Sequence, residues 1–302
     1  MSEPVRITAV ETGRIDKELA RHFPDAGRKQ LGELFDEGCV RLGKKRAKKG
    51  DRVNAGDVIE LSRTPVSGAA MRPMADPEAA AGLVVLLERP ELIAIAKVAG
   101  MPSQPLRADE RGTAANAIAA RWPECAELGD DPRDGGLVHR LDIGTSGVLV
   151  AARTQAVYRA LREAFGSGRV EKQYLAITCG RPVSRECEEP LTQRGKRVVV
   201  DHTDGLAAHT EFTVEHASAT HALVRCHART GRMHQVRAHL AAVGAPIAGD
   251  TLYGGDELPG HDGFFLHAAQ LVLPLDAERV VIDAPLPERF AHALAAVNLR
   301  AS

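Results

Sequence analysis

One carboxylate in the middle of the chain lies where a side chain could do chemistry. Asp142 follows Arg140 by two positions and begins the run Asp-Ile-Gly-Thr-Ser-Gly, residues 142–147. Residues 137–141 alternate apolar and polar side chains and residues 148–152 are almost wholly apolar, so both segments are predicted to be strands. Asp142 would then lie in a loop held by a sheet on both sides. There its carboxylate could act as a nucleophile, or it could accept hydrogen bonds from its own turn.

Two well-known motifs with similar letters do not fit residues 144–147. Gly-Thr-Ser-Gly lacks the residue between serine and the second glycine that the nucleophile elbow of hydrolases requires. It also lacks the Gly-Lys-Ser/Thr ending of a phosphate-binding loop. The loop is therefore predicted to serve neither serine hydrolysis nor nucleotide binding.

The same stretch resembles the His-Arg-Leu-Asp-x-x-Thr-Ser-Gly signature of the RluA-type pseudouridine synthases, which isomerise uridine within RNA. The signature is matched, position for position, by His139, Arg140, Leu141, Asp142, Thr145, Ser146 and Gly147. Further segments follow in the order that the family shows. They are Lys-Gln-Tyr at 172–174, Thr-Gly-Arg-Met-His-Gln-Val-Arg-Ala-His at 230–239, Gly249-Asp250 with Tyr253, Leu-His-Ala at 266–268 and Ala-Pro-Leu-Pro at 284–287.

The resemblance implies a role for each of four side chains. Asp142 would be the catalytic aspartate and Arg237 its cationic partner. Tyr174 would stack against the target base. Arg140 would insert into the space that the uridine leaves when it is flipped out of the RNA, a movement that costs a few kcal/mol. Lys97 occupies the place of the family's Lys-Pro pair, where Val98 replaces the proline, and this departure leaves the shape of that loop open.

The position of Arg237 also follows from the helical period. A helix is predicted over residues 233–243, before Gly244 and Pro246. Val236, Leu240 and Val243 share its apolar stripe, and Arg237 lies about 100° round the helix from Val236. The guanidinium at the edge of that stripe could reach a buried carboxylate.

The reaction that the resemblance implies needs no cofactor or metal ion. It breaks the bond between ribose C1′ and base N1, rotates the base and joins C1′ to C5, so nothing is oxidised and no energy source is consumed. No cofactor and no metal are therefore expected. His234 and His239 are five positions apart, whereas zinc-binding pairs on a helix use four, so these histidines with His227 are not predicted to hold a metal. Whether Asp142 attacks the ribose or the base, or assists elimination through a glycal, is left open.

The rest of the pattern predicts an α+β fold with a mixed, mainly antiparallel central sheet and flanking helices. Strands are expected over residues 83–88, 91–97, 174–178, 209–214 and 222–228. Thr113 and Thr154 are expected to cap helices that run to residues near 121 and 165. This agrees with the catalytic fold that the resemblance implies, in which the site lies in a cleft across the sheet.

Positive charge is concentrated in one short segment. The chain has a formal net charge of -1, but residues 28–52 contain nine basic and four acidic residues, a local balance of +5. This segment resembles the RNA-binding module of ribosomal protein S-four, with helices at 14–19 and 29–35 and strands at 38–44 and 56–61. The resemblance implies a small α/β RNA-binding domain over residues 1–63, whose predicted RNA contacts are Lys29, Lys44, Lys45, Arg46 and Lys48. The proline-rich residues 64–82 are predicted to be a linker, and residues 83–302 the catalytic domain.

Composition is consistent with this organisation. At 302 residues and 44% hydrophobic content, the chain can form one sizeable core and a small second domain. No apolar run approaches the roughly 20 residues that span a bilayer, and the N-terminus has no secretory pattern. The five cysteines lack Cys-x-x-Cys spacing and are expected to be free thiols. We expect a cytoplasmic monomer with no membrane partner.

These observations together predict an enzyme that isomerises specific uridines in structured RNA, above all large-subunit ribosomal RNA. A pseudouridine synthase acting on transfer RNA is one alternative. A noncatalytic RNA-binding factor for ribosome assembly is another, and the presence of Asp142, Tyr174 and Arg237 together argues against it.

Overall fold

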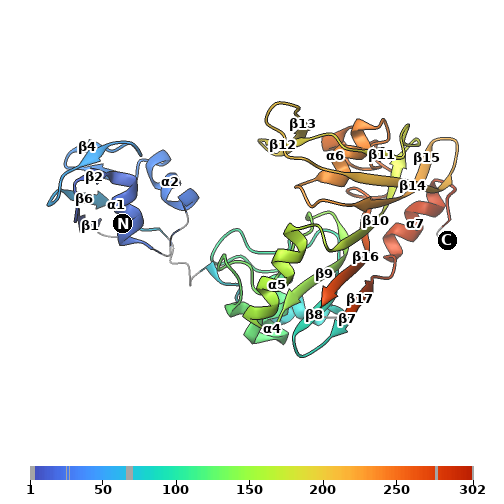
Figure 1. The fold of residues 1–302 in the computed structure, drawn as a ribbon, viewed down its shortest axis with the longest axis horizontal. Helices are drawn as coiled ribbons and strands as arrows, with labels where there is room; N and C mark the ends of the chain where they lie inside the picture. The colour runs from blue at the N-terminus through green and yellow to red at the C-terminus, as the bar shows by residue number, and fades with distance from the viewer. Residues whose placement is uncertain (1–3, 25, 27, 66–70, 276–277, 301–302) are drawn as a thin grey trace. The chain divides into compact units, whose positions relative to one another are not determined.

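The computed structural model describes residues 4–24, 26, 28–65, 71–275 and 278–300, except the side chains of Arg28 and Lys29. The chain divides into two compact units, Met1–Arg72 with Arg107–Asp109 and Pro73–Leu106 with Glu110–Ser302. Their folds are α+β, as predicted (Figure 1). No helix in the described ranges has the length and apolar character needed to cross a bilayer.

The first unit folds around a small sheet with strand order β1-β6-β3-β4. Its elements are β1 (Val5–Thr8), β2 (Gly13–Arg14), α1 (Ile15–His22), α2 (Arg28–Asp36), β3 (Val40–Leu42), β4 (Lys45–Arg46), β5 (Arg52–Val53) and β6 (Val58–Leu61). The helices and strands predicted here are present. On α2 the apolar side chains of Leu31, Leu34 and Phe35 are buried. They pack with Ile59 and Leu61 of β6, which explains why so short a segment can hold a core.

The second unit is built on a mixed sheet whose described strands follow the order β11-β14-β15-β10-β16-β9-β8-β7, with β17 also paired to β16. The pairing of β16 with β9 is parallel, and the other pairings described in this sheet are antiparallel. Its strands are β7 (Val84–Glu88), β8 (Leu92–Lys97), β9 (Ser146–Ala152), β10 (Glu171–Cys179), β11 (Glu186–Cys187), β14 (Thr210–Ala217), β15 (His221–Ala228), β16 (Leu266–Leu275) and β17 (Glu278–Asp283).

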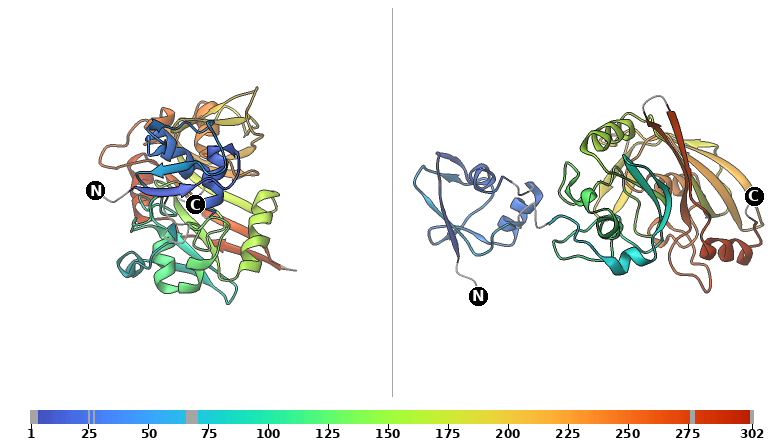
Figure 2. Two further views of the ribbon diagram at one scale, coloured as in Figure 1. Left: turned by 90° about the vertical axis from the view of Figure 1, so that its left-hand side faces the viewer. Right: turned by 90° about the horizontal axis from the view of Figure 1, so that it is seen from below.

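Helices cover both faces of this sheet. They are α3 (Pro77–Ala81), α4 (Ala114–Arg121), α5 (Gln155–Gly166), α6 (Gln235–Ala242) and α7 (Glu288–Ala296), with short 3-10 turns at Pro123–Glu127 and Thr251–Tyr253. Thr113 and Thr154 cap α4 and α5 as predicted, each accepting a hydrogen bond from a backbone N–H in the first turn. Figure 2 shows α4 and α5 on opposite faces of the sheet.

Strand β9 explains why residues 148–152 are almost wholly apolar. Val148 and Val150 pack with α5 on one face, whereas Leu149 and Ala151 pack with α4 on the other. A strand buried on both faces has no polar positions to alternate with its apolar ones. The strand that carries the loop of Asp142 is therefore fixed from both sides.

The strand predicted over residues 137–141 is wrong. Only Leu137 makes a bridge, to Ala151, and the rest of the segment is irregular. Side chains replace the missing ladder, since Ser103 Oγ exchanges hydrogen bonds with both the N–H and the carbonyl of Leu141 (3.0 and 2.8 Å). Likewise, the N–H of Val150 donates to His139 Nε2 at 3.1 Å. The backbone leading to Asp142 thus satisfies its polar groups without belonging to the sheet.

The predicted linker of residues 64–82 extends too far. Its last part forms α3, and Pro73–Leu106 belongs to the second unit. Asp76 caps α3 by accepting from the N–H of Ala79 and also accepts from the N–H of Gly112. Asn116 on α4 donates to the carbonyl of Met74. Residues 66–70 lie outside the described part of the chain.

Candidate active site

A buried lysine fixes the loop that carries Asp142. Lys97, at the end of β8, is 2% exposed, and its Nζ donates to the carbonyl oxygens of Val98, Met101 and Ile143 at 3.1, 2.7 and 3.2 Å. The N–H of Gly100 also donates to Ile143. Burial lowers the pKa of Lys97 to about 8, while the nearby Asp142 opposes this fall. The segment after Lys97, where Val98 replaces the family's proline, is thus hydrogen-bonded through Lys97 and Gly100 to Ile143, the residue that follows Asp142.

The far end of the same loop depends on a glycine. Gly147, in β9, has a φ of +119°, and a Cβ there would lie 2.1 Å from the carbonyl oxygen of Ala268 on β16. A side chain at this position would therefore separate the two strands at the point where they pair. Ser146 beside it is held by a hydrogen bond of 2.9 Å to the buried His267. Both ends of the loop are rigidly placed.

Asp142 forms an ion pair with Arg237, as the helical period suggested. Arg237 Nη1 lies 3.0 Å from Asp142 Oδ2. The Arg237 side chain is only 7% exposed, whereas that of Asp142 is 25% exposed and reaches the cavity. The buried guanidinium of Arg237 therefore fixes the position of the more accessible carboxylate of Asp142.

A second carboxylate, whose role the motif match alone did not indicate, holds Arg237 in place. Asp250 is 2% exposed and accepts from Arg237 Nε and Nη2 at 2.6 and 2.9 Å. Burial alone would lower the pKa of Arg237, but Asp250 and Asp142 together raise it. The bidentate pair uses two of the guanidinium's nitrogens and aims the third at Asp142. The Gly249-Asp250 pair that follows the helix marked this residue in the sequence, but it did not show which side chain Asp250 contacts.

His234 approaches Asp142 from the start of α6. Its φ of 50° is unusual for a residue other than glycine, and its Nε2 lies 3.8 Å from Asp142 Oδ2. Burial is the main cause that lowers the pKa of His234, so the ring tends to be neutral at pH 7. Its Nδ1 lies 3.0 Å from the hydroxyl of Tyr253. The strained backbone is thus retained where it brings an imidazole to the carboxylate.

Tyr253 joins this group to a hairpin. Its hydroxyl accepts from the N–H of Val198 at 2.9 Å, in the hairpin of β12 (Leu191–Arg194) and β13 (Arg197–Val200). Its ring packs against the guanidinium groups of Arg237 and Arg197, with 5.0 and 5.2 Å from each carbon to the ring centre. The tyrosine therefore belongs to the support of the site.

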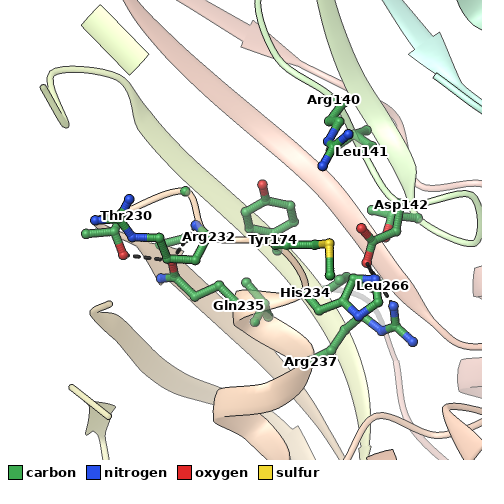
Figure 3. Close-up of a pocket in the computed structure, with 15 residues that line it drawn as sticks. Arg140, Leu141, Asp142, Tyr174, Thr230, Arg232, His234, Gln235, Arg237 and Leu266 are labelled. Atoms are coloured by element: carbon green, nitrogen blue, oxygen red, sulfur yellow. Dashed lines mark hydrogen bonds and ion pairs between the residues drawn. The ribbon is translucent and has the colours of Figure 1, made fainter. Parts of the chain in front are cut away.

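Tyr174 forms a wall of a cavity of about 160 Å³ that also contains Asp142, Arg237 and Arg140. A register shift interrupts the pairing of β10 with β16 between Gln173 and Tyr174. Such bulges re-aim a side chain, here toward the site. Burial, then the charge of Asp142, raises the pKa of the Tyr174 phenol, which is therefore neutral at ordinary pH. Figure 3 shows the side chains of Arg140, Tyr174 and Asp142 around one space, with Arg237 reaching the carboxylate of Asp142.

The predicted RNA contacts of the N-terminal segment lie in the other unit. Lys44, Lys45 and Lys48 are exposed, and no carboxylate pairs with them among the described residues. Arg46 has a structural role as well, because its Nη2 donates to the carbonyls of Phe35 and Asp36 at the end of α2 (3.2 and 2.6 Å). The side chain of Lys29 lies outside the described part of the structure.

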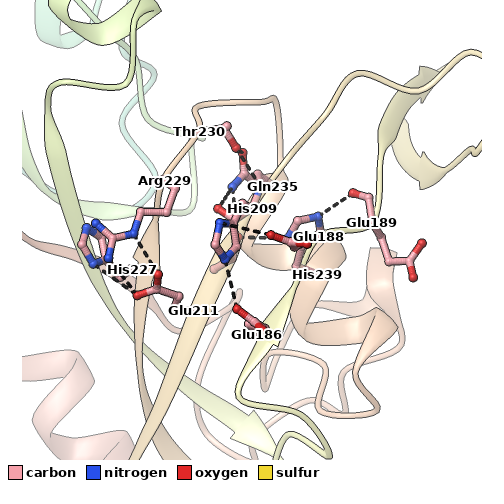
Figure 4. Close-up of polar contacts among 11 residues, drawn as sticks. Glu186, Glu188, Glu189, His209, Glu211, His227, Arg229, Thr230, Gln235 and His239 are labelled. Atoms are coloured by element: carbon pink, nitrogen blue, oxygen red, sulfur yellow. Dashed lines mark hydrogen bonds and ion pairs between the residues drawn. The ribbon is translucent and has the colours of Figure 1, made fainter.

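The three histidines considered as metal ligands have separate partners. Figure 4 shows two of them, His227 and His239. His227 lies 3.7 Å from Glu211, and His239 contacts the hydroxyl of Thr210 and the carbonyl of Glu189 at 2.9 Å each. His234 contacts Tyr253. Each imidazole therefore has its own hydrogen-bonding or charged neighbour.

Known proteins resemble this chain over most of its length. A family model described as RNA pseudouridylate synthase matches residues 91–242. Ribosomal large subunit pseudouridine synthase D of Xanthomonas campestris is 32% identical over 303 residues, covering 94% of this chain and 89% of that protein. Ribosomal large subunit pseudouridine synthase C of Escherichia coli is 33% identical over 304 residues, covering 94% and 93%. The solved structure of human RNA pseudouridylate synthase domain containing 4 shares the fold, with a TM-score of 0.59 at 23% identity, covering 72% of this chain and 94% of that one.

Proposed function

Because this chain belongs to the RNA pseudouridylate synthase family, we propose that it isomerises specific uridines of large-subunit ribosomal RNA and that Asp142 supplies the reacting carboxylate. The observation that carries the role of Asp142 is its ion pair with Arg237, itself held by the buried Asp250. Both contacts described for the carboxylate of Asp142 use Oδ2. Oδ1 is then the oxygen that reacts with the nucleotide.

Tyr174 and Arg140 complete the proposed site. The phenol of Tyr174 lines the cavity with its ring and offers a stacking surface for the uracil. Arg140 is exposed at the same cavity and has a planar group suited to stacking between bases. We propose that it fills the space of the flipped uridine and so offsets part of the few kcal/mol that flipping costs.

The names of the relatives support ribosomal RNA as the substrate, and mapping of pseudouridines tests it. A strain lacking this gene is expected to lose pseudouridine at one or more positions of its large-subunit ribosomal RNA. A plasmid copy should restore those positions, and a copy carrying Asp142→Asn should not. Loss confined to transfer RNA would overturn the ribosomal assignment.

We further propose that residues 1–63 bind RNA through the exposed lysines of the β3–β4 turn and the following loop. Replacing Lys44, Lys45 and Lys48 by glutamine is expected to weaken binding to a large-subunit transcript. The slope of log K against log salt should fall by about 2 to 3, because each lost phosphate contact no longer releases a counterion. Filter binding at several salt concentrations measures the slope. Lys17→Gln, an exposed cation on α1 of the same unit, is the matched control. An equal slope in the triple variant and the control would mean that these lysines are only solvated.

A cytoplasmic monomer remains our prediction.

A further inference from the structure

A second hollow adjoins the cavity of Asp142. It has a volume of about 550 Å³ and shares Arg140, Tyr174, Gly231 and Arg232 with that cavity. Its remaining wall comes from α5, β10 and the irregular segment before Asp142. The two hollows are therefore neighbours, separated by these four shared residues.

Positive charge exceeds negative charge in this hollow, whose lining contains five cations and the carboxylates of Asp131 and Asp134. Asp134 accepts from the hydroxyl of Tyr158 at 2.6 Å. Arg133 is paired with Asp131 through two hydrogen bonds of 2.9 and 2.7 Å, so this pair is neutral. By contrast, Arg162, Lys172 and Arg232 donate to backbone carbonyls at 3.3, 3.2 and 3.0 Å. Within the described ranges, no carboxylate lies at ion-pair distance from these three cations or from Arg140. The hollow therefore offers several cations to an anion from outside.

Lys172 is the most informative of these cations. It lies on β10, it is only 4% exposed, and the contact described for its Nζ is the carbonyl of Val170. Burial lowers its pKa to about 8, so a large share of the molecules carry the charge at pH 7. An ammonium group taken out of water without a counter-charge destabilises the fold. A bound anion would supply the missing counter-charge.

The opposite wall adds an uncharged aromatic pair. The ring of His139 stacks on Phe165, with 4.6 Å between ring centres and 17° between planes. Because His139 Nε2 accepts from the N–H of Val150, the neutral ring carries its proton on Nδ1. Burial, then the charges of Lys172 and Arg162, lowers the pKa of His139 to about 3. The histidine thus stays neutral and leaves the cations as the groups that attract an anion.

We propose that this hollow, the phosphate groove, binds the phosphodiester of the nucleotide next to the target uridine, with Lys172 as its buried partner and Arg162 at its rim. The phosphate-facing part of the lining that the proposal uses consists of Arg140, His139, Arg162, Phe165, Lys172 and Arg232. The proposal rests on the proposed function, because the neighbouring cavity must receive the uridine. It adds the part of the substrate that determines where the RNA strand enters.

Lys172→Met is the decisive variant. It is expected to reduce the slope of log K against log salt by about 0.7 to 0.9 for a large-subunit transcript, the effect of one lost phosphate contact. KM should rise about tenfold with kcat nearly unchanged, because the contact is made before and during the reaction. The melting temperature should stay equal or rise, because a buried charge has been removed. A lysine that only supports the fold would lower the melting temperature and leave the slope unchanged.

Two controls separate the groove from general effects. Lys97→Met removes another buried ammonium, one with three carbonyl acceptors and no place in the groove, and is expected to lower the melting temperature without changing the slope. Arg121→Gln removes an exposed cation of α4 that lies against Trp122, outside the groove. Its salt slope should equal that of the wild type.

A second groove variant keeps the test decisive if Lys172→Met does not fold. Arg162 is exposed on α5, so Arg162→Gln should fold normally and still reduce the slope by about 0.7 to 0.9. Wild-type slopes in both groove variants would overturn the proposal. If the wild type binds this RNA but forms no pseudouridine in it, the proposed substrate is wrong, while reduced slopes in the variants would still establish the groove.

Discussion

Asp142→Asn is expected to lower the release of tritium from C5-labelled uridine in RNA by at least about 10⁴-fold, or about 5 kcal/mol of transition-state stabilisation. An amide has nearly the same shape as the carboxylate, and its oxygen can still accept from Arg237 Nη1. It cannot act as the nucleophile or carry the negative charge that the reaction uses. The loss should therefore appear in kcat.

Binding and folding controls make this result interpretable. Arg237 keeps its bidentate contact with Asp250 in this variant, so the melting temperature should change little. Affinity for the transcript should stay within about threefold of the wild type, since the phosphate contacts are intact. Tritium release at the wild-type rate from the purified variant would refute the role of Asp142.

Asp250→Ala is expected to have the second largest effect. It leaves a guanidinium that is 7% exposed with Asp142 as its remaining carboxylate contact in the described structure. Breaking one partner of a buried pair costs about 3–5 kcal/mol of stability. A misplaced Arg237 should also reduce kcat about 10²-fold, because displacements near 1 Å already have effects of that size. Denaturant unfolding and single-turnover assays at saturating RNA measure the two effects.

The comparison with an exposed ion pair shows whether burial is the cause. Glu163→Ala removes the partner of Arg169, and the two side chains are 76% and 52% exposed. Such pairs contribute about 0–1 kcal/mol, so stability and kcat should be close to those of the wild type. If Asp250→Ala lost stability but kept its kcat, Asp250 would support the fold without positioning Arg237.

Local sequence patterns could predict the parts of the site that depend on one element. The apolar spacing of Val236 and Leu240 predicted the helix of Arg237, which the structure places at Gln235–Ala242. The apolar residues 148–152 predicted β9. The catalytic roles of Asp142 and Arg237 remain predictions, but the contact between Arg237 and a carboxylate is present. These features repeat with the period of a helix or strand, and that period is visible in a single sequence.

Features that depend on distant segments could not be predicted in this way. Residues 137–141 alternate like a strand, yet Ser103 satisfies the backbone of Leu141 from 38 positions away. The burial of Lys97 and Lys172 was equally unexpected, since lysine is almost always exposed. The clamp by Asp250 needs the backbone of Gly249, where a Cβ would lie 2.1 Å from the carbonyl of Gly263. No local sequence pattern indicates these contacts between segments that are far apart in the chain.

The place of β16 in the sheet has a consequence for synthesis of the enzyme. This strand, Leu266–Leu275, lies between β9 and β10, although both precede it by many residues in the chain. While the chain is growing from its N-terminus, the edge of β9 beside Asp142 therefore has no neighbour until β16 has been made. Pairings between residues so far apart form late, because the intervening chain must first be ordered. A nascent chain that has not yet reached β16 thus carries the signature residues without a working site, and activity begins only after this strand has been made.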